Sequence, residues 1–304
     1  MIPLYSPIQA RHPTALALGS FDGLHAGHRK VIEEITTYPY AVPTVVSFWP
    51  HPREVLYGET RLRLDLPSEK CSLLKPLGIQ QLVLVPFDSD LASLSAEQFF
   101  DEILRRQLKA KKIAIGENFR FGKNRQGDLC TLKALCNKAD IEISIVPILK
   151  DNQGRISSSR IRQSLKEGDL STTKILLGRA YNFRGLVIPG KGLGRKIGWP
   201  TANLEIDGRK FLPALGVYAA WAKKVGTNEV FASVMNLGPQ PTIDPNSPSC
   251  IEVHLLNQTI NLESQELIVE PVQRIRGQKK FPSIDSLSNQ ISLDAKTASS
   301  ILNK

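Results

Sequence analysis

The chain has 304 residues, of which 41% are hydrophobic and 22% charged, an ordinary balance for a globular protein and enough chain for two domains with separate cores. No stretch approaches the roughly 18 to 20 apolar residues of a membrane-spanning helix, and the first residues lack the pattern of a secretory signal. The net charge of +10 is spread along the chain, which disfavours the concentrated basic patch of a nucleic-acid binder and suits small polyanions such as nucleotides.

The cysteine pattern bears on the compartment. The four cysteines form neither a CxxC pair nor a regular disulfide framework. Such spacing indicates free thiols in a reducing environment. We therefore expect a cytoplasmic protein. The cysteines are Cys71, Cys130, Cys136 and Cys250.

The first half of the chain alternates short apolar, β-branched runs with segments of helical spacing. One helical segment, "SAEQFFDEILRRQLK", begins at a capping box formed by Ser95 and Gln98. Strands that are apolar on both faces and separated by helices predict a parallel sheet covered on both sides. Ligands of such a sheet bind beyond the carboxyl ends of its strands. The apolar runs lie at 14–21, 44–49, 81–87, 112–119 and 141–149.

The pattern changes near residue 180. Helical segments at 157–168 and 170–180 are followed by frequent glycines, prolines and short strand-like runs, typical of an antiparallel barrel or sandwich. An amphipathic helix at 283–302, begun by Ser283, closes the chain. We place the domain boundary between residues 178 and 179, which gives domains 1–178 and 179–304.

The segment "FDGLHAGHRK" follows the first predicted strand and holds His25 and His28. Gly19 and Gly23 allow close approach of the backbone to a ligand, and the helix that begins near Gly27 directs its free N–H groups at an anion. Two imidazoles there can donate hydrogen bonds to phosphate oxygens. A zinc site would need a third ligand, which no neighbouring motif supplies, and a purely structural role is the other alternative. The placement favours phosphate binding.

The segment "GKGLGRKIGWPTANL" predicts a second phosphate site. Its glycines at 190, 192, 194 and 198 can bring backbone N–H groups to phosphates, although glycine-rich turns between strands are common. It is not a Walker A loop, because no Lys-Ser or Lys-Thr pair and no helix follow. Thr201 and Asn203, two apart on an extended segment, face one side and offer oxygen ligands for Mg²⁺.

Several motifs of the first half, in order, resemble those of a known family. "GSFDGLHAGH" resembles the HxGH motif of the nucleotidyltransferase superfamily, and more narrowly the adenylyltransferase module of the prokaryotic bifunctional riboflavin kinase/FAD synthetase family. "SFWPHPREVL" (47–56), "GENFRFGKNRQGD" (116–128) and "ISSSRIR" (156–162) resemble further motifs of that module. The last has Ser159 where the family has threonine, which keeps the hydroxyl.

This resemblance implies an α/β nucleotidyltransferase domain with a Rossmann-like parallel sheet. The reaction implied is adenylyl transfer from ATP to FMN, which gives FAD and pyrophosphate. His25, His28 and Arg162 are implied to be catalytic. Phe121 is implied to contact the flavin, with ordinary core packing as an equal alternative. The nucleotide-binding residues implied are Gly19, Phe21, Asp22, Asn118, Ser158 and Ser159.

The second half, including "GLGRKIGWPTANL", "NLGPQPT" and "IEVHLL", resembles the riboflavin kinase module of the same family. The resemblance implies a closed antiparallel β-barrel in which Thr201 and Asn203 bind Mg·ATP. Glu252 is implied to be the base that accepts the proton of the riboflavin 5′-hydroxyl, although alternation alone is also compatible with a solvent-facing glutamate. The remaining residues implied are Gly190 and Gly194 for the nucleotide and Arg276 for the flavin.

The whole chain therefore resembles an enzyme that makes FMN from riboflavin and then FAD, with ATP and Mg²⁺. Departures from the family pattern after Leu256 keep one alternative open, an FAD synthetase whose barrel binds flavin without efficient kinase activity. A nucleotidyltransferase for another phosphorylated acceptor and a basic RNA-binding protein are more distant alternatives. For the last, the interleaved aromatic residues of an RNA-binding surface are missing. We expect flavins and ATP as partners, no nucleic acid and no membrane; protein partners and oligomeric state are not predicted.

Overall fold

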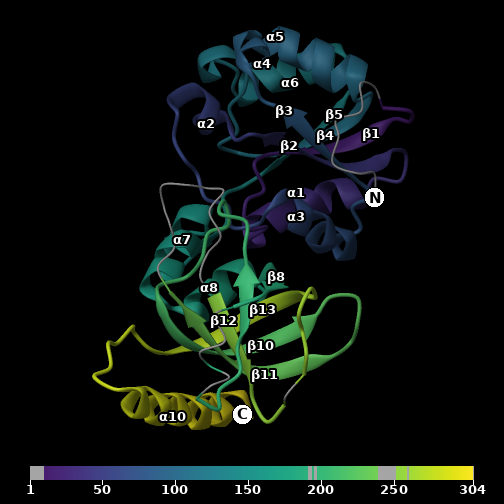
Figure 1. Cartoon of the computed structure of the whole chain (residues 1–304). Coiled ribbons are helices and arrows are strands. Elements are labelled where there is room, and N and C mark those ends of the chain that lie inside the picture. The colour runs from purple at the N-terminus through teal and green to yellow at the C-terminus, as the bar shows by residue number, and fades with distance from the viewer. Residues whose placement is uncertain (1–9, 191–193, 195–196, 239–250, 259, 304) are drawn as a thin grey trace. The chain divides into compact units, whose positions relative to one another are not determined.

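The computed structural model describes the chain apart from residues 1–9, 191–193, 195–196, 239–250, 259 and 304 (Figure 1). The chain divides into two compact units. The N-terminal unit comprises Met1–Arg61 and Leu66–Ser157, and the C-terminal unit comprises Leu62–Asp65 and Ser158–Lys304. Each unit has its own architecture.

A five-stranded parallel sheet forms the centre of the N-terminal unit, which confirms the predicted fold class (Figure 1). The strand order is β3-β2-β1-β4-β5, so the first strand lies in the middle and its carboxyl end is flanked on both sides. This is where an α/β sheet binds ligands. The strands are β1 (Thr14–Leu18), β2 (Val42–Trp49), β3 (Gln81–Pro86), β4 (Ala110–Gly116) and β5 (Glu142–Val146).

Helices cover both faces of this sheet, because alternate strand residues face opposite sides. Ala15, Ala17 and Val45 belong to the core layer that includes α1 (Ala26–Thr36) and α3 (Pro67–Leu74). The opposite layer holds η2 (Phe99–Gln107) and α6 (Leu129–Lys138). The predicted capping box at Ser95 and Gln98 is present. The other elements are α2 (Pro52–Tyr57), η1 (Lys75–Leu77), α4 (Ser89–Ser93), α5 (Ala96–Gln98), η3 (Lys123–Arg125), β6 (Lys150–Asp151) and β7 (Gly154–Arg155).

A closed six-stranded barrel forms the C-terminal unit, as the family resemblance implied. Every neighbouring pair is antiparallel, in the order β10-β11-β12-β9-β8-β13. Helix α8 packs against β13. The elements are α7 (Ser158–Glu167), α8 (Leu170–Leu177), β8 (Phe183–Ile188), β9 (Ala202–Glu205), β10 (Gly216–Lys224), β11 (Val230–Leu237), β12 (Ile251–Leu255), β13 (Glu266–Arg276) and α10 (Ile284–Leu302).

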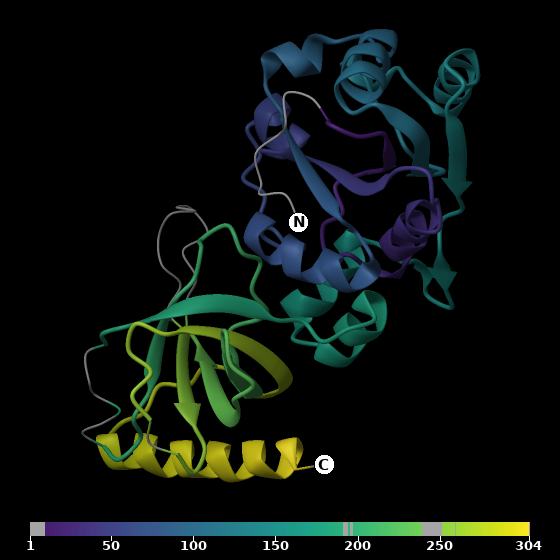
Figure 2. The ribbon, with the colours of Figure 1, turned by 90° about the vertical axis from the view of Figure 1, so that its right-hand side faces the viewer.

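Helix α10 begins after the predicted cap Ser283 and lies along the barrel wall (Figure 2). Its Ala295 and Ala298 are buried in a cluster with Val217 and Val234 of the barrel strands. The helix is therefore part of the C-terminal unit's core. Helices α7 and α8, which precede the boundary predicted at 178/179, also pack within this unit. The division of the two reactions at 178/179 stays a prediction, because the compact units do not show which residues each reaction needs.

The four-residue segment Leu62–Asp65 belongs to the C-terminal unit although the rest of the first half does not. Its backbone pairs with that of the 209–211 segment, and the carbonyl of the fully buried Leu64 accepts a hydrogen bond from Nζ of Lys210 at 2.7 Å. Asp65 forms an ion pair with Arg179 at 2.7 Å, with side-chain exposures of 2% and 17%. Sequence patterning does not reveal this long-range insertion.

Candidate active sites

The turn after β1 is held in an uncommon backbone conformation. Phe21 and Leu24 have φ angles of 45° and 44°, and Gly23 has a φ angle of 90°. Positive φ is rare for bulky residues, and here the side chains of Phe21 and Leu24 are each only 1% exposed. The buried side chains therefore anchor the turn in the core below α1. Such backbone strain clusters at functional sites.

His25 and His28 lie together at the start of α1. His25 is the N-cap, and its Nδ1 accepts a hydrogen bond from the backbone N–H of His28 at 3.3 Å. Because Nδ1 accepts, the proton of a neutral His25 ring is on Nε2. The two rings are stacked with centroids 3.7 Å apart and an interplanar angle of 16°. The rings of Phe21 and His28 also meet in an edge-to-face arrangement, with centroids 5.2 Å apart.

Both imidazoles are neutral at physiological pH. Burial, reinforced by the charge of Arg155, lowers the pKa of His25 to about 4, although Asp22 opposes the shift. Burial also lowers the pKa of His28 well below its usual value, and His25, Lys70 and Arg155 lower it further. Neutral rings bind phosphate as hydrogen-bond donors, not as cations. Nδ1 of His28 is buried without a hydrogen-bond partner in the described part of the chain.

Sequence reasoning missed two basic residues near this pair. Arg155, at the end of β7, acts on the pKa of both histidines. With its amide oxygen turned toward the guanidinium, Asn118 accepts hydrogen bonds from Arg155 at 2.9 and 3.3 Å. Lys70 of α3 is buried and donates to the carbonyl of Ser20 at 2.7 Å. Arg155 directly precedes the "ISSSRIR" motif, which could have singled it out, whereas no local signal marks Lys70.

The other residues predicted for this site have structural partners. Gly19 follows β1 and donates its N–H to Val46 at 3.2 Å. Asp22 is buried, with 3% exposure. Phe121 is 6% exposed and stacks on Phe119 with centroids 5.7 Å apart, so it contributes to the core. Contact of Phe121 with flavin stays a prediction.

Ser158, Ser159 and Arg162 form the first turns of α7, in the C-terminal unit. The guanidinium of Arg162 donates to the carbonyls of Ser158 and Leu62, each at 3.3 Å, and lies 5.8 Å from the Phe211 ring centroid. The structure therefore brings the three predicted residues together on one helix. Their participation in the reaction at the histidine pair stays a prediction.

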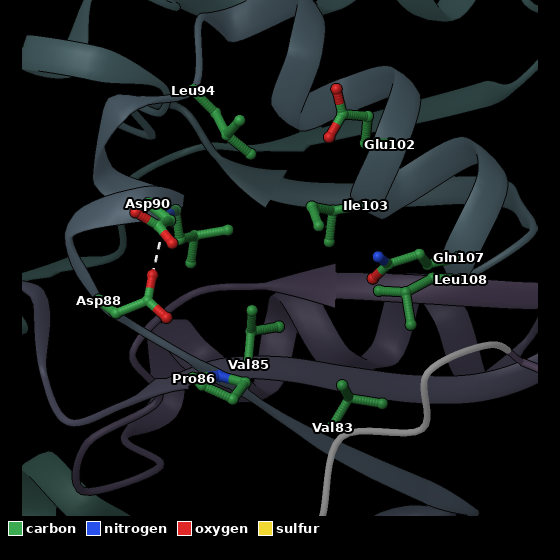
Figure 3. A pocket seen from close by; sticks show the side chains of 11 residues that line it. Val83, Val85, Pro86, Asp88, Asp90, Leu94, Glu102, Ile103, Gln107 and Leu108 are labelled. Atoms are coloured by element: carbon green, nitrogen blue, oxygen red, sulfur yellow. Dashed lines mark hydrogen bonds between the residues drawn. The ribbon is translucent and has the colours of Figure 1, made fainter.

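A separate hollow of about 340 Å³ lies between β3, α4 and η2 (Figure 3). Val83, Val85 and Ile103 supply apolar walls, while Asp90 and Glu102 supply carboxylates. None of the site residues predicted from the sequence lines it. Its acidic groups make it unsuitable for a phosphate, because like charges repel.

The second predicted site lies on the outer face of the barrel. Ile251, Val253 and Leu255 of β12 point inward and are buried, so Glu252 points outward and is half-buried. In register, Glu252 lies opposite Asn203 of β9. Residues directly opposite on antiparallel strands place their side chains on the same face. The structure thus brings the predicted base and a predicted nucleotide ligand together.

Asn236 of β11 lies on the other side of Glu252. The strands place these two residues opposite each other, and Nδ2 of Asn236 donates to Oε2 of Glu252 at 3.0 Å. Glu252 is therefore a hydrogen-bonded side chain rather than one surrounded only by solvent. No pattern in the sequence marked Asn236 apart from its position at the start of "NLGPQPT". Residues 239–242 of that motif lie outside the described residues.

The glycine-rich loop approaches Thr201 and Asn203 closely. A Cβ at Gly190 would overlap the amide of Asn203, and one at Gly194 would overlap the carbonyl of Trp199 and lie 3.2 Å from Oγ1 of Thr201. The absence of a side chain at both glycines therefore leaves room for the two oxygen-bearing residues. Gly192 lies outside the described residues.

Arg276, predicted to contact the flavin, forms an ion pair with Asp294 of α10 at 2.7 Å. Both side chains are largely buried, at 13% and 3% exposure, and Nε also donates to Asp294. This pair fastens α10 to β13. Contact of Arg276 with flavin stays a prediction.

Within the described residues, no group of three or more His, Cys, Asp or Glu side chains could hold a metal ion. Mg²⁺ does not require such a group, because it keeps several waters and takes ligands from substrate phosphates. The hydroxyl of Thr201 and the amide oxygen of Asn203 are ligands of the type that Mg²⁺ accepts. These residues fit Mg·ATP binding.

The family model described as FAD synthetase matches residues 8–160, and the one described as riboflavin kinase matches residues 177–302. The chain is 35% identical to the bifunctional riboflavin kinase/FMN adenylyltransferase of Haemophilus influenzae, over 95% of this chain and 94% of the relative. It is 36% identical to the protein of the same name from Bacillus subtilis, over 94% and 91%.

A solved Streptococcus pneumoniae structure, described as a macrolide-efflux protein, superposes with a TM-score of 0.84. It is 31% identical and covers 96% of this chain and 95% of its own. In the described part of this chain, no helix combines the length and apolar character needed to cross a membrane.

Proposed function

Because the chain belongs to the bifunctional riboflavin kinase/FAD synthetase family, we propose that its two reactions are carried by the two groups of residues described above. The chain is a riboflavin kinase and an FMN adenylyltransferase: it makes FMN and ADP from riboflavin and ATP, and FAD and pyrophosphate from FMN and ATP. We assign adenylyl transfer to residues 1–178 and phosphorylation to residues 179–304. We also assign the enzyme to the cytoplasm.

In adenylyl transfer, an FMN phosphate oxygen attacks the α-phosphorus of ATP, and pyrophosphate leaves as its bond to that phosphorus breaks. His25 and His28 donate hydrogen bonds from neutral rings to phosphate oxygens whose charge increases in the transition state. Arg155 and Lys70 supply the positive charge that neutral imidazoles do not. Preorganised donors of this kind need no rearrangement during the reaction.

The remaining predicted residues of this half position the substrates. Asn118, held by Arg155, binds nucleotide or the incoming phosphate. Arg162, with the hydroxyls of Ser158 and Ser159, binds the leaving pyrophosphate through a guanidinium and a helix start. The turn residues Gly19, Phe21 and Asp22 bind the nucleotide, and Phe121 lies against the flavin.

In riboflavin phosphorylation, the 5′-hydroxyl attacks the γ-phosphorus of ATP. Glu252 accepts the hydroxyl proton as the new phosphorus–oxygen bond forms. Thr201 and Asn203 hold Mg²⁺, which neutralises phosphate charge when bound with ATP. Gly190 and Gly194 let the loop backbone bind the nucleotide, and Arg276 contacts the flavin.

One observation supports this proposal above the others: each unit contains one cluster suited to one of the two reactions. The neutral, stacked histidines at a helix start suit transition-state stabilisation, and Glu252 beside Asn203 suits proton transfer next to Mg·ATP. To test it, purified protein is incubated with riboflavin, ATP and Mg²⁺, and the flavins are separated. FMN and FAD are expected, both dependent on Mg²⁺. FAD from supplied FMN without FMN from riboflavin would favour the synthetase-only alternative.

A further inference from the structure

We propose that Asn236, held in place by Gln278, is a positioning residue for Glu252 in riboflavin phosphorylation. The inference rests on the proposed role of Glu252 as the base. It concerns a chain of three side chains that runs from the segment after β13, through β11, to β12. Neither Asn236 nor Gln278 is among the residues assigned to substrate above.

The hydrogen bonds define the direction of this chain. Nε2 of Gln278 donates to the backbone carbonyl of Leu237 at 2.7 Å and to Oδ1 of Asn236 at 2.9 Å. A backbone carbonyl can only accept, so it requires the NH₂ group of Gln278 to face it. Because this NH₂ group of Gln278 also contacts the side chain of Asn236, the amide oxygen of Asn236 must face Gln278. The NH₂ group of Asn236 must consequently face Glu252, and it does so at 3.0 Å from Oε2.

This fixed orientation matters because an amide can present either its oxygen or its nitrogen. An Asn236 turned the other way would place an oxygen against the Glu252 carboxylate, which is repulsive. Gln278 excludes that orientation, since its two N–H groups are both in use by acceptors. The backbone carbonyl of Leu237 thus orients Gln278, which orients Asn236, which in turn holds the Glu252 carboxylate.

The carboxylate gains a defined position from this contact. A glutamate has three rotatable side-chain bonds, and an unrestrained one would sample several rotamers. With Oε2 bound by Asn236, Oε1 is the oxygen that accepts the proton of the riboflavin hydroxyl. A displacement of about 1 Å in a reacting group can reduce turnover by about 10²-fold. We therefore expect Asn236 to act on kcat and to have little effect on substrate binding.

A merely structural role makes a different prediction. The Gln278–Asn236 bond could serve only to fasten the segment after β13 to β11. A comparison of Asn236→Ala with Gln278→Ala separates the two roles, because both break the Gln278–Asn236 bond but only Asn236→Ala removes the donor to Glu252. A fastening role predicts the same kinase turnover in these two variants. The positioning role predicts a larger loss in Asn236→Ala, and a further loss in Asn236→Asp, whose carboxylate repels that of Glu252.

The experiment measures kcat and KM for riboflavin phosphorylation in Asn236→Ala, Asn236→Asp, Gln278→Ala and Glu252→Gln, with FAD formation from supplied FMN as the internal control. We expect kcat to fall by about 10- to 100-fold in both Asn236 variants and by less in Gln278→Ala, with KM and FAD formation unchanged. The double variant Asn236→Ala/Glu252→Gln should be no slower than Glu252→Gln alone, because Asn236 acts through Glu252.

The outcomes separate the inference from its premise. Normal phosphorylation in Glu252→Gln would overturn the base assignment and the positioning role with it. Slow phosphorylation in Glu252→Gln with the same kcat in Asn236→Ala and Gln278→Ala would overturn the positioning role alone. The positioning role would also be overturned if the kcat losses of Asn236→Ala and Glu252→Gln multiplied in the double variant. Should Asn236→Ala fail to fold, the isosteric aspartate variant and Gln278→Ala decide the question.

Discussion

Acidification should destabilise the N-terminal unit through His25. The folded unit holds the pKa of this imidazole at about 4, whereas an unfolded chain titrates it near 6.5. Below pH 6.5 the unfolded state therefore takes up a proton that the folded state resists, and stability falls as the pH falls toward 4. Above pH 6.5 both states are neutral at this residue and the contribution vanishes.

The magnitude follows from the two pKa values. At pH 5, protonation of His25 in the unfolded state lowers the free energy of unfolding by RT ln[(1 + 10^1.5)/(1 + 10^−1)], which is about 2 kcal/mol. Below pH 4 this loss reaches its limit of about 3 kcal/mol. The matched variant is His25→Asn. Asparagine is a good N-cap and keeps an acceptor for the N–H of His28, but it does not titrate.

The measurement is the opening free energy of α1 from hydrogen exchange of full-length protein at pH 7.5 and 5.0, corrected for the pH dependence of the intrinsic exchange rate. Between pH 7.5 and 5.0, the opening free energy of α1 should fall by about 2 kcal/mol more in the wild type than in His25→Asn. The same loss in both proteins would show that His25 is not held neutral by the fold and would refute the reasoning. An NMR titration of His25 gives the folded pKa independently.

Three further changes have expected outcomes. Gly190→Ala places a methyl group on the Asn203 amide, so riboflavin phosphorylation should fall by about 5- to 150-fold while FAD formation from FMN persists, as steady-state assays of both reactions would show. Arg155→Gln removes a charge that lowers the pKa of His25, so an NMR titration should find that pKa raised, and FAD formation should slow. Asp294→Ala leaves the largely buried Arg276 without its carboxylate, so the free energy of unfolding measured in urea should fall by about 3–5 kcal/mol. The control Asp285→Ala, at an exposed position of the same helix, should lower it by less than about 1 kcal/mol.

The sequence predicts features whose cause is local. Period-two and period-3.6 patterns identify the strands and helices, and Ser95 and Ser283 mark helix starts because capping is a local interaction. The residues of the "HAGH" motif also act locally, since His25 caps the helix that carries His28. The proximity of those two rings was therefore predictable from their spacing.

Features that depend on distant segments were not predictable. Lys70 reaches the Ser20 carbonyl from 50 positions away, and Asn236 meets Glu252 only because β11 and β12 pair in one register. The insertion of Leu62–Asp65 into the C-terminal unit likewise has no local signal. Strand pairing and buried ion pairs are settled by the packing of the whole unit, which single-sequence patterns do not encode.

The most direct test of two reactions at two sites measures both half-reactions in His28→Ala and in Glu252→Gln. His28→Ala should lose about 10²- to 10³-fold in FAD formation from FMN and keep riboflavin phosphorylation. Glu252→Gln should lose about 10²- to 10⁴-fold in riboflavin phosphorylation and keep FAD formation. A folded variant that loses both reactions together, or that keeps the reaction assigned to its altered residue, would contradict the division of the two chemistries between these residues.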